Sequence, residues 1–512
     1  MYKLLCFVTV CLLCLATAFG QSKPSETAER SHVERFSTPE VKAERAEAEA
    51  SAKLKTNPSD AEALNQRSVA RMQLGHYSSA LEDLKRAVSL NPGDANYWAN
   101  LGYVLWKLGQ PPEAIKAERE AIRLDEKSYT GHYQLGRFLL RSDSKQVAEA
   151  TNHLKRALEI DPRQYEVRFE LIAAYRVTGD LAPAMAQYDL LQDARPSDPR
   201  VIYVGALLSA DRSDMNSAIT SFREALRRDP NLYGAWQDLG LAYMKLNRWP
   251  DAEESFGELA RRQEGSVEGA YFHALALYNT GKAAAAEAEV RRALRLDAGA
   301  TEAHILLGII LASRGNANVE ATEALSQAIA LDPNSFDASF YLGRVQYATK
   351  DFAGAAKSLR NAVRLDPRHA EARFFLGTVL EAGGESEAAL DQYDLLARSN
   401  PQSAMGQLGL GALLLKQGKR DEAIAVLQRA IELDPKNFEA HWALGRALLL
   451  SQRFTEAVEN LKSAVLLAPY RSDAHYQLGL ALQRLGRAED AAREFAIVDQ
   501  LNTEFRTNKS PN

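Results

Sequence analysis

The chain has 512 residues, of which 62 are Lys or Arg and 67 are Asp or Glu, so its formal net charge is −5. This balance argues against a general nucleic-acid-binding protein, which needs a basic surface to displace counterions from phosphates, and against a polybasic membrane-surface protein. Hydrophobic residues make up 46% of the chain, which is enough for a folded core and argues against wholesale disorder.

Residues 1–20 have the pattern of a secretory signal peptide. Lys3 is a positive start, residues 4–15 are an uncharged and mostly apolar run, and small residues follow at Ala16 and Ala18. We expect cleavage near Ala18 or Gly20. The alternative is an uncleaved anchor, because residues 4–20 are 17 residues without charge, the lower limit for a span.

Both alternatives place the rest of the chain beyond the membrane, since Lys3 stays inside. We therefore expect an exported protein, periplasmic or extracellular and envelope-associated, that contacts the membrane only through an uncleaved signal if at all. All three cysteines, Cys6, Cys11 and Cys14, lie in this segment. The mature chain would then have no disulfide, thiolate metal site or cysteine nucleophile, which suits an oxidising compartment.

Residues 21–37 are predicted to be a flexible polar tether, and residues 38–60 a capping half-repeat helix. Beyond them, prolines recur at intervals of 34 residues, for example at Pro367, Pro401 and Pro435. Self-alignment gives thirteen units over residues 61–503 with small insertions in two of them, and a polar tail at residues 504–512. The units begin at Ala61, Ala95, Tyr129, Tyr165, Pro199, Tyr233, Val267, Thr301, Phe336, Ala370, Ala404, Phe438 and Ser472.

Each unit has the pattern of two amphipathic helices. Apolar residues recur at steps of three and four, as at Leu444, Leu448 and Leu461, with a turn near Arg453. Nine units carry Gly at the eighth position and all thirteen carry Ala at the twentieth, which would let the two helix backbones approach closely. One such pair cannot bury its faces alone, whereas thirteen stacked units can.

These marks resemble the tetratricopeptide repeat family, whose motif is visible in Trp98-x-x-Leu101-Gly102 and in Trp236-x-x-Leu239-Gly240-x-x-Tyr243. The resemblance implies an all-α fold, a right-handed α-α superhelix (solenoid) whose first helices line a concave groove. The family often adds a solvating helix after the last unit. We expect none here, which would leave an exposed C-terminal end.

We find no pattern that predicts an enzyme. The sequence has no Gly-rich phosphate loop, His-Glu-x-x-His helix or nucleophile elbow. His304, His441 and His475 share the fourth position of their units with Trp98 and Trp236, which indicates packing rather than catalysis. We therefore predict no catalytic residue, cofactor, metal or small-molecule substrate.

The resemblance implies that the second, fifth, ninth and twelfth positions of each first helix face the groove. Aromatic residues at the fifth position could pack against a partner segment or merely support neighbouring helices. They are Tyr133, Phe169, Tyr203, Tyr271, Phe340, Phe374, Trp442 and Tyr476.

Two further stretches complete the predicted groove. Lys107, Arg137, Arg141 and Arg176 could form a positive patch for a carboxylate, unless they are solvated or paired with neighbouring Glu. An apolar middle suited to a partner helix is predicted at Leu241, Met244, Leu275, Tyr278, Ile305 and Ile309. Arg344 and Arg446 occupy the ninth position of their units, where no unit has the Asn that chaperone-binding members use to clamp a carboxylate.

We therefore predict a non-catalytic scaffold outside the cytoplasm that binds peptide segments or helices of other proteins, in envelope assembly or secretion. The alternative is a polysaccharide-export or cell-wall factor that binds glycan or its export machinery, because an aromatic ladder can also stack on sugars. Nucleic acid is not an expected partner in either case.

Overall fold

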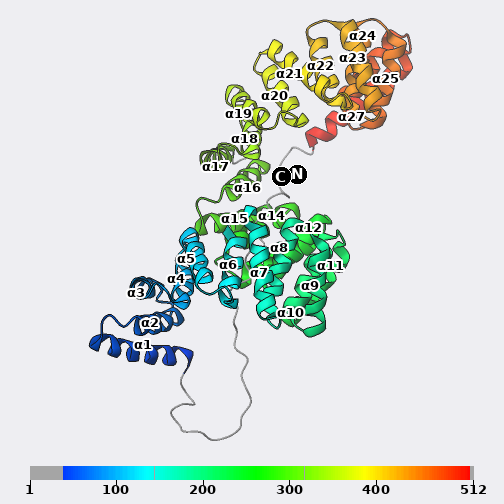
Figure 1. The fold of residues 1–512 in the computed structure, drawn as a ribbon. Coiled ribbons are helices and arrows are strands. Elements are labelled where there is room, and N and C mark those ends of the chain that lie inside the picture. Colours follow the sequence, from blue (N-terminus) through cyan, green and yellow to red (C-terminus); the bar gives the residue numbers. More distant parts are fainter. Residues whose placement is uncertain (1–37, 143, 316–317, 508–512) are drawn as a thin grey trace. The chain divides into compact units, whose positions relative to one another are not determined.

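The computed structural model describes residues 38–142, 144–315 and 318–507. These residues form 27 α-helices and one short 3-10 helix, with no strand among them, which confirms the predicted all-α solenoid (Figure 1). The predicted signal peptide and the tether lie outside the described residues.

Each predicted unit consists of a first and a second helix, and every first helix begins at the residue predicted to open its unit. The first helices are α2 (Ala61–Gln73), α4 (Ala95–Lys107), α6 (Tyr129–Ser142), α8 (Tyr165–Thr178), α10 (Pro199–Asp211), α12 (Tyr233–Lys245), α14 (Val267–Asn279), α16 (Thr301–Ser313), α18 (Phe336–Ala348), α20 (Ala370–Ala382), α22 (Ala404–Lys416), α24 (Phe438–Leu450) and α26 (Ser472–Arg484).

Within each of the two compact parts of the chain, which meet at residues 264 and 265, the second helices pack against the first helices of their own and of the following repeats. They are α3 (Tyr77–Leu90), α5 (Pro111–Leu124), α7 (Val147–Ile160), α9 (Leu181–Ala194), α11 (Met215–Arg228), α13 (Trp249–Arg262), α15 (Ala283–Leu296), α17 (Asn318–Leu331), α19 (Phe352–Leu365), α21 (Ser386–Ser399), α23 (Arg420–Leu433), α25 (Phe454–Leu467) and α27 (Ala488–Thr507). The short helix η3 (Ser144–Gln146) lies in the insertion between α6 and α7.

The chain divides into two compact units, one ending at Glu264 and the other beginning at Gly265. We call the first, described from α1 to α13, the N-unit, and the second, from α14 to α27, the C-unit. Among the described helices, none is both long and apolar enough to cross a membrane.

In the nine repeats with an eighth-position glycine, this glycine on the first helix faces a large side chain on the second helix. A Cβ atom at Gly343 would lie only 2.6 Å from Leu359 Cγ, so the eighth position must stay small for the twenty-fourth residue to pack against it. The twentieth-position alanines are buried in all thirteen repeats. These two positions therefore explain the close approach of the helices that the sequence predicted.

Repeat two departs from this pattern because its twenty-fourth residue is Glu118. Its carboxyl group lies against Gly102, is fully buried, and has neither oxygen hydrogen-bonded. Burial raises the pKa of Glu118 well above its ordinary value of 4.5, because the charged form loses its hydration. Burial therefore favours the neutral form of this side chain, in a core that elsewhere uses apolar or aromatic residues at this position.

The turn between the two helices of a repeat uses a left-handed residue at its fifteenth position. Eight of these residues are glycines, as at Gly75 and Gly486. The other four among the described residues are Ser213, Asn247, Lys350 and Gln452, with φ between 57° and 66°. A side chain is strained in this conformation, whereas glycine is not.

In eight repeats the fourth-position side chain fastens the first helix to the turn before it. Trp98 Nε1 donates a hydrogen bond to the carbonyl oxygen of Pro92 at 2.9 Å, and His475 Nε2 lies 3.0 Å from that of Pro469. The same contact, six residues back, is made by His132, Arg168, Trp236, His304, Arg373 and His441. The histidines at this position thus have the packing role that the sequence indicated.

Helix α1 (Pro39–Thr56) packs on α2 within the predicted capping segment, burying Ala43, Ala50 and Leu54. Arg71 of α2 links α1 to α3, because its guanidinium contacts Glu47 of α1 at 2.7 Å and Asp83 of α3 at 2.8 Å.

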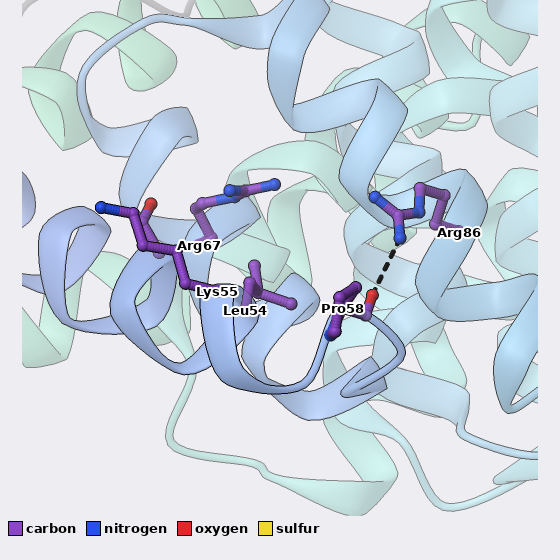
Figure 2. Close-up of a pocket in the computed structure, with 6 residues that line it drawn as sticks. Leu54, Lys55, Pro58, Arg67 and Arg86 are labelled. Carbon is purple, nitrogen blue, oxygen red and sulfur yellow. Dashed lines mark hydrogen bonds between the residues drawn. The ribbon is translucent and has the colours of Figure 1, made fainter.

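Figure 2 shows a shallow hollow of about 230 Å³ between α1, α2 and α3. Its lining includes Arg67, which pairs with Asp83, and Arg86, which donates to the carbonyl oxygen of Pro58 at 2.8 Å. These two cations are therefore satisfied within the fold.

The opposite end of the array differs from the predicted boundary. The polar tail was expected from residue 504, whereas α27 continues to Thr507 and is 20 residues long, against 14 for the other second helices. The last repeat therefore extends its own second helix instead of ending near Thr503.

Candidate partner-binding surface

In both the N-unit and the C-unit, the first helices of the repeats lie on the inner side of the stack. Neighbouring first helices contact one another directly in most repeats, as do α2 with α4 and α16 with α18. Among the described helices, no two neighbouring second helices do so to a comparable extent. The stack therefore curves with its first helices inside, and we call the surface formed by their second, fifth, ninth and twelfth positions the inner face.

The predicted positive patch on the N-unit is mostly neutralised by internal ion pairs. Arg137 and Arg141 of α6 share Glu170 of α8, at 3.2 Å and 2.9 Å. Arg176 of α8 pairs with Asp211 of α10, where one hydrogen bond measures 3.1 Å. Of the four predicted cations, Lys107 alone is exposed and has no ionic partner within the described residues, and its ammonium lies 5.6 Å from the centroid of the Tyr103 ring. For the three arginines, the structure thus favours the alternative of pairing with acidic residues of the neighbouring repeat.

A second polar contact on the N-unit joins α10 to α12. The hydroxyl of Tyr203 donates to Asp238 at 2.6 Å. Burial raises the pKa of Asp238 to about 6, partly offset by the hydrogen bond from Tyr203 and by the charge of Arg176, and reinforced by Asp211. The fifth-position ring of this repeat therefore serves an internal contact.

The remaining fifth-position aromatics divide by exposure. Phe340 resembles Tyr203 in being only 5% exposed, so both support neighbouring helices and offer little surface. Tyr476 is 46% exposed. The other members of the ladder are half-buried, namely Tyr133, Phe169, Tyr271, Phe374 and Trp442. The ladder thus combines structural rings with rings that a partner could reach.

The six residues of the predicted apolar middle are divided between the N-unit and the C-unit. Leu241 and Met244 belong to α12 of the N-unit, whereas Leu275, Tyr278, Ile305 and Ile309 belong to α14 and α16 of the C-unit. All six are half-buried. In the C-unit, Leu275, Tyr278 and Ile305 pack against the core of their own repeats.

The C-unit contains an arginine surrounded by aromatic rings. Arg344 of α18 is exposed, and its guanidinium carbon lies 5.7 Å from the Phe340 ring centroid, 5.8 Å from that of Tyr341 and 6.0 Å from that of Phe375. Tyr347 packs on Phe375 with ring centroids 5.3 Å apart. We call Arg344 with Tyr341, Tyr347 and Phe375 the Arg344 platform.

Tyr341, Tyr347 and Phe375 were missed as site residues from the sequence. The signal was present, because Tyr341 and Phe375 occupy the sixth position and Tyr347 the twelfth of neighbouring repeats. A second, simpler case is Arg446, whose guanidinium carbon lies 4.7 Å from the ring centroid of Trp442. Neither Arg344 nor Arg446 has an ionic partner within the described part of the chain.

Among the described residues, no group of three or more His, Cys, Asp or Glu side chains is placed to hold a metal ion. The fourth-position histidines are occupied on both sides in three repeats. His475 Nδ1 lies 2.6 Å from Glu494, His441 Nδ1 lies 3.3 Å from Asn460, and His132 Nδ1 lies 2.9 Å from His153 Nδ1. What the inner faces present is therefore aromatic and cationic surface.

Comparison with known families agrees with this architecture. A tetratricopeptide repeat model matches residues 65–129, 204–267, 238–301, 271–335, 320–360, 342–404 and 408–473, and two further tetratricopeptide models match 141–208 and 473–496. The chain belongs to the tetratricopeptide repeat family.

Several tetratricopeptide relatives share part of the chain. Cellulose synthase operon protein C of Pseudomonas fluorescens (strain SBW25) is 27% identical over 28% of this chain and 12% of its own length. The BBSome complex member BBS4 homolog of Drosophila melanogaster is 21% identical over 46% of this chain and 58% of its own length. DnaJ homolog subfamily C member 7 of Homo sapiens is 22% identical over 40% of this chain and 36% of its own length. The chain thus spans less than two thirds of the length of each.

Two solved structures are similar over most of their own length. The Cut9 and Hcn1 hetero-tetramer of APC/C aligns with 86% of this chain and 94% of its own at 15% identity and a TM-score of 0.45. YrrB, described as a tetratricopeptide protein with an unusual peptide-binding site, aligns with 37% of this chain and 96% of its own at 24% identity and a TM-score of 0.33.

Proposed function

We propose that the chain is a non-catalytic scaffold that binds segments of partner proteins on the inner faces of its two units. Membership of the tetratricopeptide family supports a role in protein interaction. The observation that carries the proposal is the C-unit inner face, where Arg344 and Arg446 lack ionic partners among the described residues and lie over half-buried rings. Arginine and aromatic side chains of this kind dominate binding energy at protein interfaces.

Site-specific photo-crosslinking tests this assignment. A photoreactive residue is placed at Lys107, next to the inner face of the N-unit, or at Arg344 or Tyr476 on the inner face of the C-unit. The matched controls are the exposed Lys85, Lys357 and Lys462 of the second helices. We expect crosslinks to the same protein partner from the inner positions only. Equal capture from both sets, or capture of no protein from envelope extract by the inner positions, would refute an inner-face scaffold.

We place this scaffold outside the cytoplasm, in envelope assembly or secretion. Support comes from the signal-like residues 1–20 and from the lack of any cysteine after Cys14. A reporter enzyme that is active only outside the cytoplasm, fused after residue 37, should be active. An inactive fusion whose full chain stays in the cytoplasmic fraction would overturn this location while leaving peptide binding intact.

A second candidate is a glycan-binding role in polysaccharide export or the cell wall. It is favoured by the partial similarity to cellulose synthase operon protein C and by rings that could stack on sugars. Because Phe340 is buried, Trp442 and Tyr476 are the more informative residues to replace. Glycan binding that is lost in Trp442→Ala and Tyr476→Ala would support this role, and no binding to any envelope glycan would reject it.

A further inference from the structure

Arg344 and Arg137 occupy the same position of their repeats, but they differ in the side chain that faces the guanidinium. Arg137, at the ninth position of α6, pairs with Glu170 at the sixth position of α8. The residue equivalent to Glu170 beside Arg344 is Phe375, at the sixth position of α20. The chain thus replaces the internal counterion of this site with an aromatic ring.

The rings leave the hydrogen-bonding edges of Arg344 available. A cation–π contact uses the face of the guanidinium, whereas its five N–H donors point outward in the plane. Across the described residues, Arg344 makes no hydrogen bond or ion pair. An exposed guanidinium with open edges fits a planar acceptor, and a carboxylate binds it bidentately.

The rings of the Arg344 platform are held in place before any ligand arrives. Phe375 makes edge-to-face contacts with Phe340 at 6.5 Å and with Tyr347 at 5.3 Å, and Phe340 meets Tyr341 edge-to-face at 5.5 Å. Tyr341, Tyr347 and Phe375 keep part of their surface exposed. Binding would therefore cost little side-chain ordering, and it would reward an apolar group beside the carboxylate.

The charges around the site limit how acidic the ligand can be. Asp337 and Glu371, at the second positions of α18 and α20, both act electrostatically on Tyr341, and neither forms an ion pair with Arg344 within the described residues. Their negative charge opposes a run of acidic residues across the platform. A single carboxylate flanked by apolar side chains suits the site better than a polyacidic tract.

We propose that the Arg344 platform recognises a short partner segment in which one Asp or Glu is flanked by apolar residues. This inference rests on the proposed scaffold function and names the chemistry of its ligand. The carboxylate accepts two hydrogen bonds from Arg344, and the flanking apolar side chain packs on Tyr347 and Phe375.

Selection from a displayed library of random short peptides tests this specificity on the full mature chain. We expect the wild-type protein to enrich sequences with one acidic residue beside an apolar residue. Arg344→Gln should remove the acidic preference and weaken the selected peptides about tenfold or more, the loss expected for a charge-assisted hydrogen-bonded pair. Arg344→Glu should shift the preference to Lys or Arg, which a purely structural role would not produce.

Arg364→Gln is the matched control, because Arg364 is exposed on α19, between α18 and α20 in sequence, but on a second helix. It should leave the preference unchanged, and thermal unfolding should show that all variants are folded. Enrichment without acidic residues, enrichment of polyacidic tracts, or no enrichment would each overturn the inference. In those cases, partner capture by the inner-face crosslinks would still uphold the scaffold function. Failure of the inner-face crosslinks to capture a partner would count against the scaffold function.

Discussion

Glu118 offers a sharp test of the packing in this array, because every other repeat has an apolar or aromatic residue at the same position. Replacing it with Leu, as in Glu118→Leu, should stabilise the N-unit. The leucine would pack against Gly102 as Leu154 packs against Gly136 in the next repeat, where Leu154 Cγ lies 2.7 Å from the position of a Cβ at that glycine. Removing an unsatisfied buried polar group should contribute about 1–3 kcal/mol.

The gain should grow with pH. Because the folded state holds the Glu118 proton more tightly than the unfolded state, wild-type stability from this group is fully present below pH 4.5. It is then lost at about 1.4 kcal/mol per pH unit as pH rises from 4.5 toward the raised pKa. Glu118→Leu removes that slope, and Glu118→Gln removes it too while keeping a polar group in the core.

Hydrogen exchange of the α4, α5 and α6 amides is the suitable assay, because stability in a repeat array is local and a single global value is not defined. We expect slower exchange in Glu118→Leu at all pH values and a pH-independent opening free energy between pH 5 and 8. Faster exchange in Glu118→Leu, or a wild-type slope that persists in both variants, would refute a buried neutral carboxyl at this position.

Three other predictions concern contacts in and between repeats. Asp83→Ala should destabilise α1 to α3 by about 3–5 kcal/mol, because it leaves two partly buried arginines without their shared carboxylate. Urea unfolding monitored by hydrogen exchange would measure this loss, and an unchanged urea midpoint would contradict it. Tyr203→Phe should raise the pKa of Asp238 above about 6, since the lost hydrogen bond favours the ionised carboxylate. Because of Asp238, the N-unit loses stability as pH rises from about 3.8, and this pH range would then extend further upward. NMR titration of the Asp238 carboxyl carbon would measure its pKa in both proteins. A lower pKa in Tyr203→Phe would exclude this account. Lys350→Gly should stabilise the C-unit by about 1 kcal/mol by relieving its positive φ, whereas Lys350→Ala should give no gain; equal urea midpoints for Gly and Ala would argue against strain at this turn.

Local features of the fold could be predicted from the sequence because they repeat. Unit starts such as Tyr129 and Phe336 follow from a 34-residue spacing and a helical apolar pattern, and each depends only on neighbouring residues. The role of the fourth-position histidines followed in the same way, since tryptophan occupies the same place in other units.

Contacts between repeats could not be predicted as well. Whether Arg137 reaches Glu170, 33 residues away, depends on how one repeat is rotated on the next. The same rotation decides that Arg344 meets Phe375 instead of a carboxylate. The division after Glu264, which separates Met244 from Leu275, has no counterpart in the repeat pattern that was used.

The hydrogen bonds from the fourth position imply that the repeats differ in how strongly they resist stretching. A repeat junction fastened by Trp98 or His475 must break a hydrogen bond before it opens. Leu64, Ile202 and Ala270 occupy the same position and have no side-chain donor. Force applied to the repeats would therefore stretch turns that lack this hydrogen bond, such as those ahead of these three residues, before the turns that have it.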